Sequence, residues 1–88
     1  MTAPQTQAAV TVRYWAAARA AAGVDEQTLE LAVPTTVGVV VDAAVAAHPA
    51  LARVARVATF LLDGRSVGRD APVADGASLE VLPPFAGG

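Results

Sequence analysis

The 88-residue sequence contains no cysteine and no lysine, and only 5% of its residues are aromatic. Without cysteine, the chain can form no disulfide, no thiolate metal site and no side-chain sulfur nucleophile. All six positive residues are arginine. The chain therefore offers no side-chain amine to another copy of itself, which excludes a polymer linked through its own lysines. The scarcity of positive charge, with a net charge of −2, argues against a nucleic-acid-binding surface.

Long hydrophobic runs are also absent. A membrane helix needs about 20 consecutive apolar residues, and the longest candidate is interrupted at Asp42 and followed by Arg53 and Arg56. Residues 1–9 have neither the basic region nor the apolar core of a signal peptide. We therefore expect a cytoplasmic protein that does not contact a membrane.

The composition is nevertheless that of a folded domain. Hydrophobic residues make up 55% of the chain and charged residues 16%, which is too apolar for a disordered protein. We expect one folded domain over residues 10–82, preceded by a flexible tail over residues 1–9 and followed by an extended tail over residues 83–88.

The first half of the domain reads as a hairpin that contains a short helical insertion. Residues Val10–Trp15 and Gln27–Val33 alternate apolar and polar side chains, which predicts two strands. Between them, Ala16–Ala22 is nearly all alanine, the best helix former, and Gly23 fits a helix C-cap. The two strands most simply pair antiparallel.

The middle of the chain carries conflicting signals. Val37–Ala47 has apolar residues at helical spacing, but its β-branched start favours a strand locally. We predict a helix, because Thr35 or Thr36 can supply an N-cap and alanines continue the segment. Pro49 ends or kinks this helix, and Ala50–Arg56 adds a further turn.

The second half of the domain reads as strands joined by tight turns. Val57–Leu62 is apolar throughout, which predicts a central strand covered on both faces. Asp63-Gly64 is a strong hairpin signal. The remaining elements are a short strand Arg65–Val67, a connection over residues 70–73, a turn at Asp75-Gly76 and a last strand Ser78–Leu82.

This order, β-β-α-β-β-β, predicts an α+β fold. One main helix packs on one face of a mixed sheet of four or five strands. The first and last strands lie side by side in parallel at the centre, as in the β-grasp or ubiquitin-like arrangement. The C-terminal tail then projects from a central strand.

That tail has an unusual composition. Pro83 and Pro84 lack the N–H that a sheet ladder requires, so they end the strand and stiffen the exit. Gly87 and Gly88 make the backbone thin and flexible. Six extended residues reach roughly 20 Å at about 3.3 Å each. Such a tail suits a probe that carries an unhindered carboxylate into another protein's active site; the alternative is an ordinary frayed terminus.

The sequence resembles the MoaD/ThiS family of ubiquitin-like sulfur carriers, and within it the small subunits of molybdopterin synthase. The resemblance covers nearly the whole chain beyond residue 9. It rests on Val12–Gly23, Thr36-Val37, His48–Leu51, Leu62–Gly64 with Val67, Pro72–Gly76 and the terminal run Leu82–Gly88.

The resemblance implies a function as sulfur-donor subunit of a sulfurtransferase. An E1-like, MoeB-like enzyme adenylates the Gly88 carboxylate with ATP. A sulfur donor such as a rhodanese or a cysteine desulfurase then converts it to a thiocarboxylate. A MoaE-like large subunit, in a heterotetramer, uses that sulfur to build the molybdopterin dithiolene from cyclic pyranopterin monophosphate. The chain itself would bind no cofactor and no metal.

Within this hypothesis Gly88 is the reacting residue, and residues Pro83, Pro84, Phe85, Ala86 and Gly87 form the inserting tail. The expected partner-binding residues are Leu82, Arg19, Arg65 and Arg69. We interpret His48 as a helix-end residue and Asp63 and Asp75 as turn residues. We expect Tyr14, Trp15 and Phe60 in the core or half-buried in the sheet, and we identify no general base.

Three alternatives stay open on the sequence. The chain could serve thiazole or cysteine synthesis as a sulfur carrier with the same tail chemistry. It could also be a β-grasp interaction module whose tail does no chemistry. A third alternative is a protein modifier conjugated to lysines of other proteins.

Overall fold

The centre of the fold is a parallel pair of strands from opposite ends of the chain. In the computed structural model, which describes residues 6–84, β1 (Gln7–Tyr14) lies beside β7 (Ser78–Leu82). Even-numbered residues of β1 are buried and odd-numbered residues face the other side, as the period of a strand requires. The predicted parallel pairing is confirmed. The strand begins at Gln7, so residues 7–9, predicted as tail, belong to the sheet.

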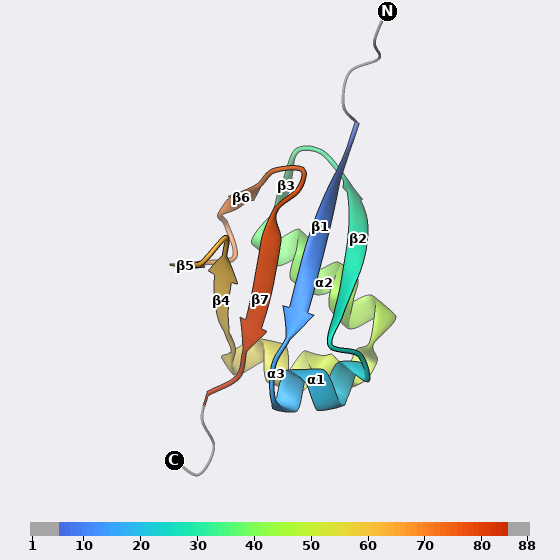
Figure 1. Ribbon diagram of the computed structural model, residues 1–88, viewed down its shortest axis with the longest axis vertical. Helices are drawn as coiled ribbons and strands as arrows, with labels where there is room; N and C mark the ends of the chain where they lie inside the picture. The colour runs from blue at the N-terminus through green and yellow to red at the C-terminus, as the bar shows by residue number, and fades with distance from the viewer. Residues whose placement is uncertain (1–5, 85–88) are drawn as a thin grey trace, which may run out of the picture.

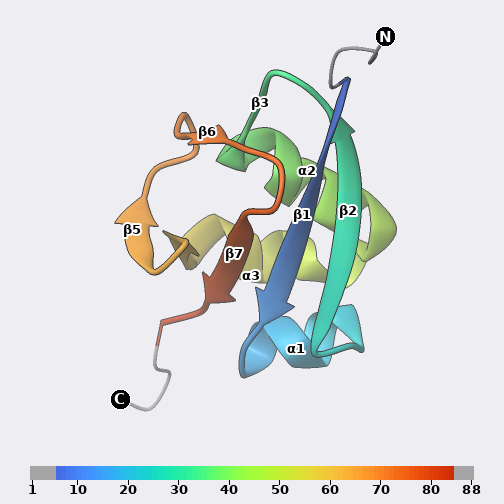
Figure 2. The same cartoon turned by 45° about the horizontal axis from the view of Figure 1, so that its top comes forward.

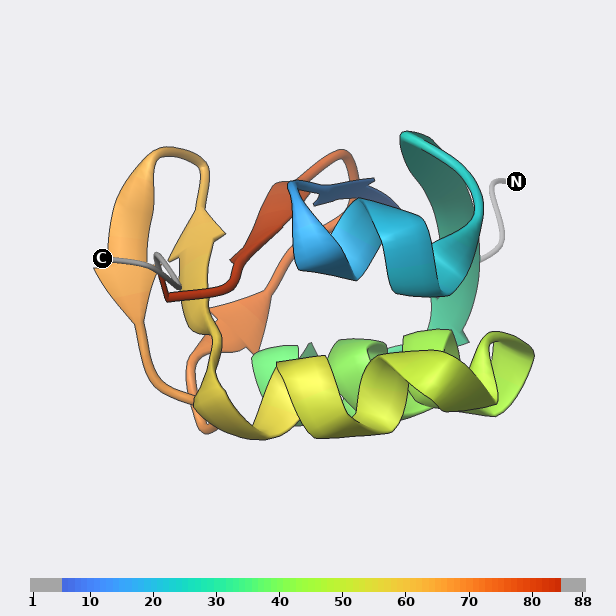
Figure 3. The same ribbon diagram turned by 90° about the horizontal axis from the view of Figure 1, so that it is seen from below.

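Five strands form the main sheet, in the order β2 (Glu26–Ala32), β1, β7, β4 (Thr59–Leu62) and β5 (Arg65–Val67). The strand β2 (Glu26–Ala32) pairs antiparallel with β1, as predicted. Between them, α1 (Ala17–Ala22) ends at Gly23, whose φ of 78° is the left-handed conformation expected of a glycine C-cap. Figure 3 shows the helices gathered on one side of the sheet. This is the β-grasp arrangement that the sequence predicts.

The middle segment, in which helical spacing and local strand propensity conflict, is a helix. The helix α2 (Val37–Ala47) begins after Thr36, whose hydroxyl accepts a hydrogen bond from the Val39 N–H at 3.4 Å. The cap resolves the conflict because it satisfies an N–H group that the helix itself leaves unpaired. One side of α2 then packs on the sheet through Val37, Val40, Val41 and Ala44.

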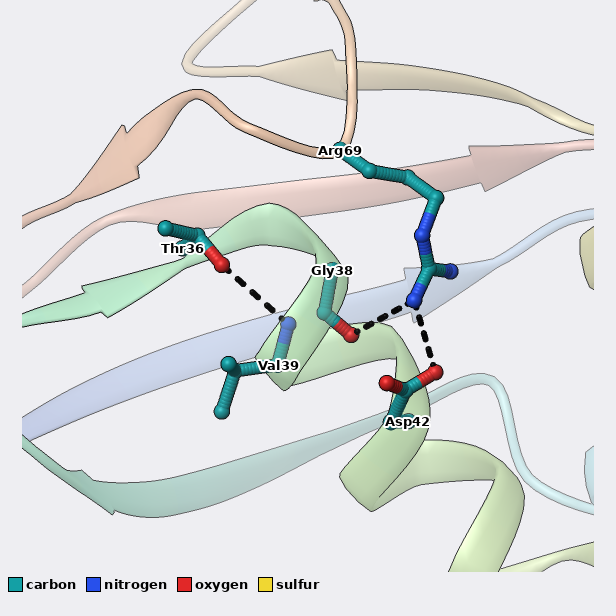
Figure 4. Close-up of polar contacts among 5 residues, drawn as sticks. All are labelled: Thr36, Gly38, Val39, Asp42 and Arg69. Atoms are coloured by element: carbon teal, nitrogen blue, oxygen red, sulfur yellow. Dashed lines mark hydrogen bonds and ion pairs between the residues drawn. The ribbon is translucent and has the colours of Figure 1, made fainter.

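Arg69 connects the start of α2 to the loop that precedes β6 (Pro72–Val73) (Figure 4). The Gly38 N–H donates to the Arg69 carbonyl at 2.8 Å. The Arg69 guanidinium donates to the Gly38 carbonyl at 3.3 Å and to the Asp42 carboxylate at 2.8 Å. A Cβ at Gly38 would lie 3.2 Å from Arg69 atoms, so this approach favours glycine.

Beyond α2 the structure corrects the prediction. A 3₁₀ turn, η1 (Pro49–Leu51), leads into α3 (Ala52–Val57), so Val57 ends a helix and is 63% exposed. The strand β4 (Thr59–Leu62) starts later than predicted. It lies between β7 and the edge strand, and Leu61 and Leu62 are only half-buried. The expectation of a central strand covered on both faces is therefore wrong.

The hairpin β4–β5 is as predicted. The strand β5 (Arg65–Val67) pairs antiparallel with β4. Asp63 and Gly64 both have positive φ, 49° and 86°, which is the backbone of a two-residue hairpin turn. The Asp63 carboxylate also accepts from the Ser78 N–H at 2.9 Å, which ties the turn to the start of β7.

A second, two-stranded ladder was not predicted. In it, β3 (Thr35–Thr36) pairs antiparallel with β6 (Pro72–Val73). The ladder closes the end of the core above α2 (Figure 2). Thr35 is 3% exposed there, and its hydroxyl has no hydrogen-bond partner within the described residues. A buried hydroxyl without a partner costs folding free energy.

Replacing Thr35 by valine is therefore expected to stabilise the protein by about 1 kcal/mol, because the shape is kept and the unpaired hydroxyl is removed. The adjacent Thr36→Val is the matched control. It removes the N-cap of α2 and is expected to destabilise by about 1 kcal/mol. Urea denaturation of both variants measures the two changes. Equal losses in both would show that the Thr35 hydroxyl has a partner.

Candidate functional site

The C-terminal strand leaves the fold at the end of the sheet where β1 also ends (Figure 1). Leu82 is the last residue of β7 and pairs with Thr59 of β4. Pro83 is half-buried and Pro84 exposed, and neither belongs to a strand. The prolines thus end the ladder where the sequence predicted. Phe85, Ala86, Gly87 and Gly88, the remaining predicted tail residues, lie outside the described residues.

Beside this exit, the open face of the sheet carries an apolar patch. Side chains of Leu61 and Leu82 are each half-buried on the face opposite the helices. Glu80 lies across from Leu61 in the ladder. Trp15 adds its ring to the same face. We call Trp15, Leu61 and Leu82 the docking patch, because partly exposed apolar side chains grouped on one face are typical of protein interfaces.

Trp15 is more exposed than the sequence predicted. It follows the last residue of β1 and is 41% exposed. Its indole N–H donates to the Glu80 carboxylate at 2.9 Å, and the Arg13 guanidinium lies 5.3 Å from its ring centroid. Of the predicted core aromatics, Tyr14 and Phe60 are buried. Side chains alternate between the two faces along β1, so Trp15 points to the opposite face from the buried Tyr14. This alternation could have predicted that Trp15 is exposed.

The residue after Trp15 has an unusual backbone. Ala16 has φ 49° and ψ −121°, a region that glycine adopts readily and other residues adopt at a cost. The conformation turns the chain from β1 into α1. The Trp15 carbonyl then accepts from the Ala18 N–H at 2.9 Å, and the Trp15 N–H donates to the Val81 carbonyl at 3.3 Å. Strain at Ala16 therefore accompanies the positioning of Trp15 beside β7.

Arg19 lies next to the patch. It forms an exposed ion pair with Asp25 at 3.6 Å. Both residues line a hollow of about 110 Å³, together with Arg13, Tyr14 and Trp15. Exposed pairs of this kind contribute little to stability, so the Arg19 guanidinium remains available to an acidic group from outside.

Arg65 in the β4–β5 hairpin and Arg69 in the loop after it differ in whether the chain itself supplies a partner for the guanidinium. Arg69 is engaged within the chain by Gly38 and Asp42, so its predicted role toward a partner competes with a structural one. Arg65 is exposed at the start of β5 and makes no ion pair with any residue of the part that the structure describes. Of the two, Arg65 has the side chain better placed to meet a partner.

The other polar candidates are structural. His48 caps the end of α2 and shares the Gln27 side-chain oxygen with the Tyr14 hydroxyl, each at 2.6 Å. Burial raises the pKa of Tyr14 to about 12, so its hydroxyl stays neutral at physiological pH. Asp75 accepts from the Ala9 N–H at 2.7 Å. The helix-end and turn interpretations of His48, Asp63 and Asp75 are confirmed.

Neither a metal-binding cluster nor a membrane-spanning helix is found among the described residues. Residues 6–84 contain no group of three acidic, histidine or cysteine side chains that could hold a metal ion. No helix in this part of the chain is long and apolar enough to cross a membrane. What the described residues do bring together is the end of β7 at Leu82 and the docking patch beside it.

Comparison with known proteins gives consistent similarities. The profile of the ThiS family matches residues 12–88. The molybdopterin synthase sulfur carrier subunit of Chlamydomonas reinhardtii is 36% identical over 81 residues, which cover 90% of this chain and 98% of that protein.

Solved structures show the same fold. SAMP1 from Haloferax volcanii has a TM-score of 0.84 at 28% identity, over 91% of this chain and 99% of its own. A putative molybdopterin converting factor, subunit 1, from Pyrococcus furiosus has a TM-score of 0.80 at 27% identity, over 89% and 99% of the two chains.

Proposed function

Because this chain belongs to the ThiS family of ubiquitin-like sulfur carriers, we propose that it is the sulfur-carrier subunit of a molybdopterin synthase. The observation that carries the proposal is the family match through residue 88, with the tail following directly on the central strand β7. A tail on a central strand is held at its base by neighbours on both sides. Its far end can then be delivered to a defined place in a partner.

The proposed chemistry begins at the Gly88 carboxylate, which is a poor electrophile. An E1-like activating enzyme joins it to AMP from ATP and releases pyrophosphate. The terminal sulfur of a donor's persulfide attacks the acyl carbon, and AMP leaves. A thiol then cleaves the resulting acyl disulfide and frees the Gly88 thiocarboxylate. In the large subunit its sulfur displaces an oxygen substituent of cyclic pyranopterin monophosphate, which gives a thioester between Gly88 and the pterin. Water then hydrolyses the acyl–sulfur bond, so the sulfur stays on the pterin and Gly88 returns as a carboxylate. Two such transfers, each from one thiocarboxylated chain, build the dithiolene.

The residues of this chain contribute geometry to that sequence of steps. Gly88 presents the reacting carbon without a side chain, and Gly87 keeps the last peptide thin. Pro83 and Pro84 reduce the conformational entropy that the tail loses on insertion. Phe85 supplies an aromatic anchor. General acid and base groups come from the partners.

The intact mass of the protein tests this proposal. We incubate it with ATP, the cognate activating enzyme and a sulfide source, and expect a gain of about 16 Da, the exchange of one oxygen for sulfur. Omitting ATP should remove the gain, because the carboxylate is then not activated. If the complete mixture gives no gain, the proposed carrier chemistry is wrong.

The choice among pathways depends on the partner. The thiocarboxylated protein is mixed with the cognate large subunit and with the thiazole synthase of the same cell. We propose that only the large subunit removes the sulfur and makes molybdopterin from cyclic pyranopterin monophosphate. Thiazole formation instead would assign the same carrier to the runner-up pathway.

The docking patch supplies a prediction about the large subunit. Leu61→Asp places a charge on the patch, and desolvating that charge opposes binding. We expect the dissociation constant for the large subunit to rise by about 30-fold or more. Isothermal titration calorimetry measures the change. Thr28→Asp, on the same open face but two strands from β7, is the matched control and should leave the constant nearly unchanged.

A second candidate is supported by the likeness to small archaeal modifier proteins. In this reading, a target lysine attacks the Gly88 adenylate, AMP leaves and an isopeptide bond forms. The absence of lysine limits each target site to one copy. Arg69 is the last trypsin cleavage site in the sequence. After digestion, a modified target would therefore carry residues 70–88 of this chain attached to one of its lysines. Detecting that remnant in the cell would support modification; thiocarboxylate without it supports the carrier.

A further inference from the structure

The strand β2 forms a free edge of the main sheet. It is seven residues long, and among residues 6–84 its one strand neighbour is β1 (Figures 1 and 2). The opposite edge, β5, has three residues. A long edge strand leaves a row of main-chain donors and acceptors available to another chain. The described structure covers β2 on its helix side, where α2 contacts it, but leaves its outer edge without a neighbouring strand.

The hydrogen bonds at the two ends of β2 identify the free groups. The Asp25 carbonyl accepts from the Tyr14 N–H at 2.8 Å, and the Val33 N–H donates to the Thr6 carbonyl at 3.1 Å. The register between them has no bulge. In an antiparallel pair, alternate residues bond to the same neighbour, so odd-numbered residues bond to β1. The N–H and C=O groups that point outward are those of Glu26, Thr28, Glu30 and Ala32.

Side chains along this edge differ between the two faces. On the helix side, Leu29 and Leu31 are only partly buried against the core. On the open face, Glu26 and Glu30 are exposed. The Glu26 carboxylate forms an ion pair with Arg13 at 3.7 Å, and Glu30 makes no ion pair within residues 6–84. The edge is therefore apolar on one side and acidic on the other.

We propose that β2 binds an extended segment of a partner protein in which apolar and basic residues alternate. The segment adds a strand to the sheet through the outward groups of β2. Its apolar side chains lie beside Leu29 and Leu31, and its basic side chains lie beside Glu26 and Glu30. Because β1 separates β2 from β7, such a partner leaves the tail exit free and is independent of the tail chemistry.

The acidic side also argues against a second copy as the occupant. Two β2 strands paired antiparallel about Thr28 would place Glu26 of one copy opposite Glu30 of the other. Like charges directly opposite in a sheet are destabilising. A basic segment removes this repulsion and replaces it with attraction.

The probe is a blocked peptide, Val-Lys-Val-Lys-Val-Lys-Val, titrated into ¹⁵N-labelled full-length protein and followed by NMR. We expect the largest shifts and slowed hydrogen exchange at the amides of Glu26, Thr28, Glu30 and Ala32. The matching peptide with glutamate in place of lysine should bind at least about tenfold more weakly. The double variant Glu26→Lys, Glu30→Lys should reverse this preference.

Two controls isolate the main-chain bonds. Thr28→Pro removes an outward N–H and leaves the bonds to β1, a change that edge strands tolerate, and it should abolish binding. Peptide methylated on alternate amide nitrogens should also fail to bind, whether or not that variant folds. Equal binding of both charged peptides, shifts confined to β4 and β7, or no shifts would overturn the proposal. Concentration-dependent dimerisation through β2 would overturn it in favour of a second copy.

Discussion

Deleting Gly88 is expected to abolish the ATP-dependent mass gain. The shortened chain still ends in a glycine carboxylate, that of Gly87, so the chemical group is kept and only its position changes. One residue shortens an extended tail by about 3.3–3.6 Å. A misplacement of even about 1 Å can cost roughly 100-fold in rate, because the reacting atoms must meet within van der Waals distance.

This result depends on the tail being fixed at its base. Leu82 pairs with Thr59 of β4, and Val81 before it pairs with Tyr14 of β1, so the tail cannot slide forward to recover the lost length. The measurement is the rate of mass gain under single-turnover conditions with excess activating enzyme. Ala86→Ser is the matched control, since it keeps both the length and the two terminal glycines, and its rate should stay within about threefold of the parent.

A deletion variant that still gains sulfur at the parent rate would contradict the proposed role of Gly88. It would mean that the activating enzyme accepts the tail at variable depth. The terminus would then serve as a flexible tether, and the docking patch alone would set the specificity.

The sequence predicts secondary structure correctly where a local rule and the tertiary contacts favour the same element. The alternation in Val10–Tyr14 matches the two faces of a sheet covered on one side only. Asp63-Gly64 satisfies its turn by backbone conformation alone. The helix α2 was chosen over a strand because of its threonine cap, and Thr36 makes that bond. Each of these features is decided within a few residues.

The errors arose where distant contacts decide. The run Val57–Leu62 looks uniformly buried, but Val57 projects from the end of α3 and Leu61 faces the open side of the sheet. The β3–β6 ladder joins two dipeptides that are far apart in the chain. Neither feature has a periodic signal, because too few residues take part for a period to appear.

The candidate site divides in the same way. The end of β7 at Pro83 and Pro84 was predicted from those residues alone, because proline acts through its own backbone constraint. The remaining tail residues stay a prediction. Of the docking patch, the sequence pointed only to Leu82. Trp15 and Leu61 were not predicted to join it, because the three residues come from three strands or strand ends and meet only in the folded sheet. Arg69 was predicted to bind a partner, but its guanidinium contacts Asp42, which lies 27 residues away in the chain.

Leu51→Ala is expected to cost about 2–5 kcal/mol of folding free energy. Leu51 is 0% exposed and ends the 3₁₀ turn η1, which contacts α1, α2 and α3. The turn that ends at this buried side chain thus lies against three helical segments, and small helices of six residues such as α1 and α3 depend on such packing for their stability. Truncation leaves a cavity that a close-packed interior fills only in part.

That cost is a large share of the total, because domains of this size are stable by only about 5–15 kcal/mol. Urea denaturation followed by circular dichroism measures it, and the melting temperature should fall by roughly 10 °C or more. Val57→Ala is the matched control, an exposed apolar residue at the end of α3, and should change stability by less than about 0.5 kcal/mol. Equal effects of the two substitutions would mean that Leu51 does not join the helices.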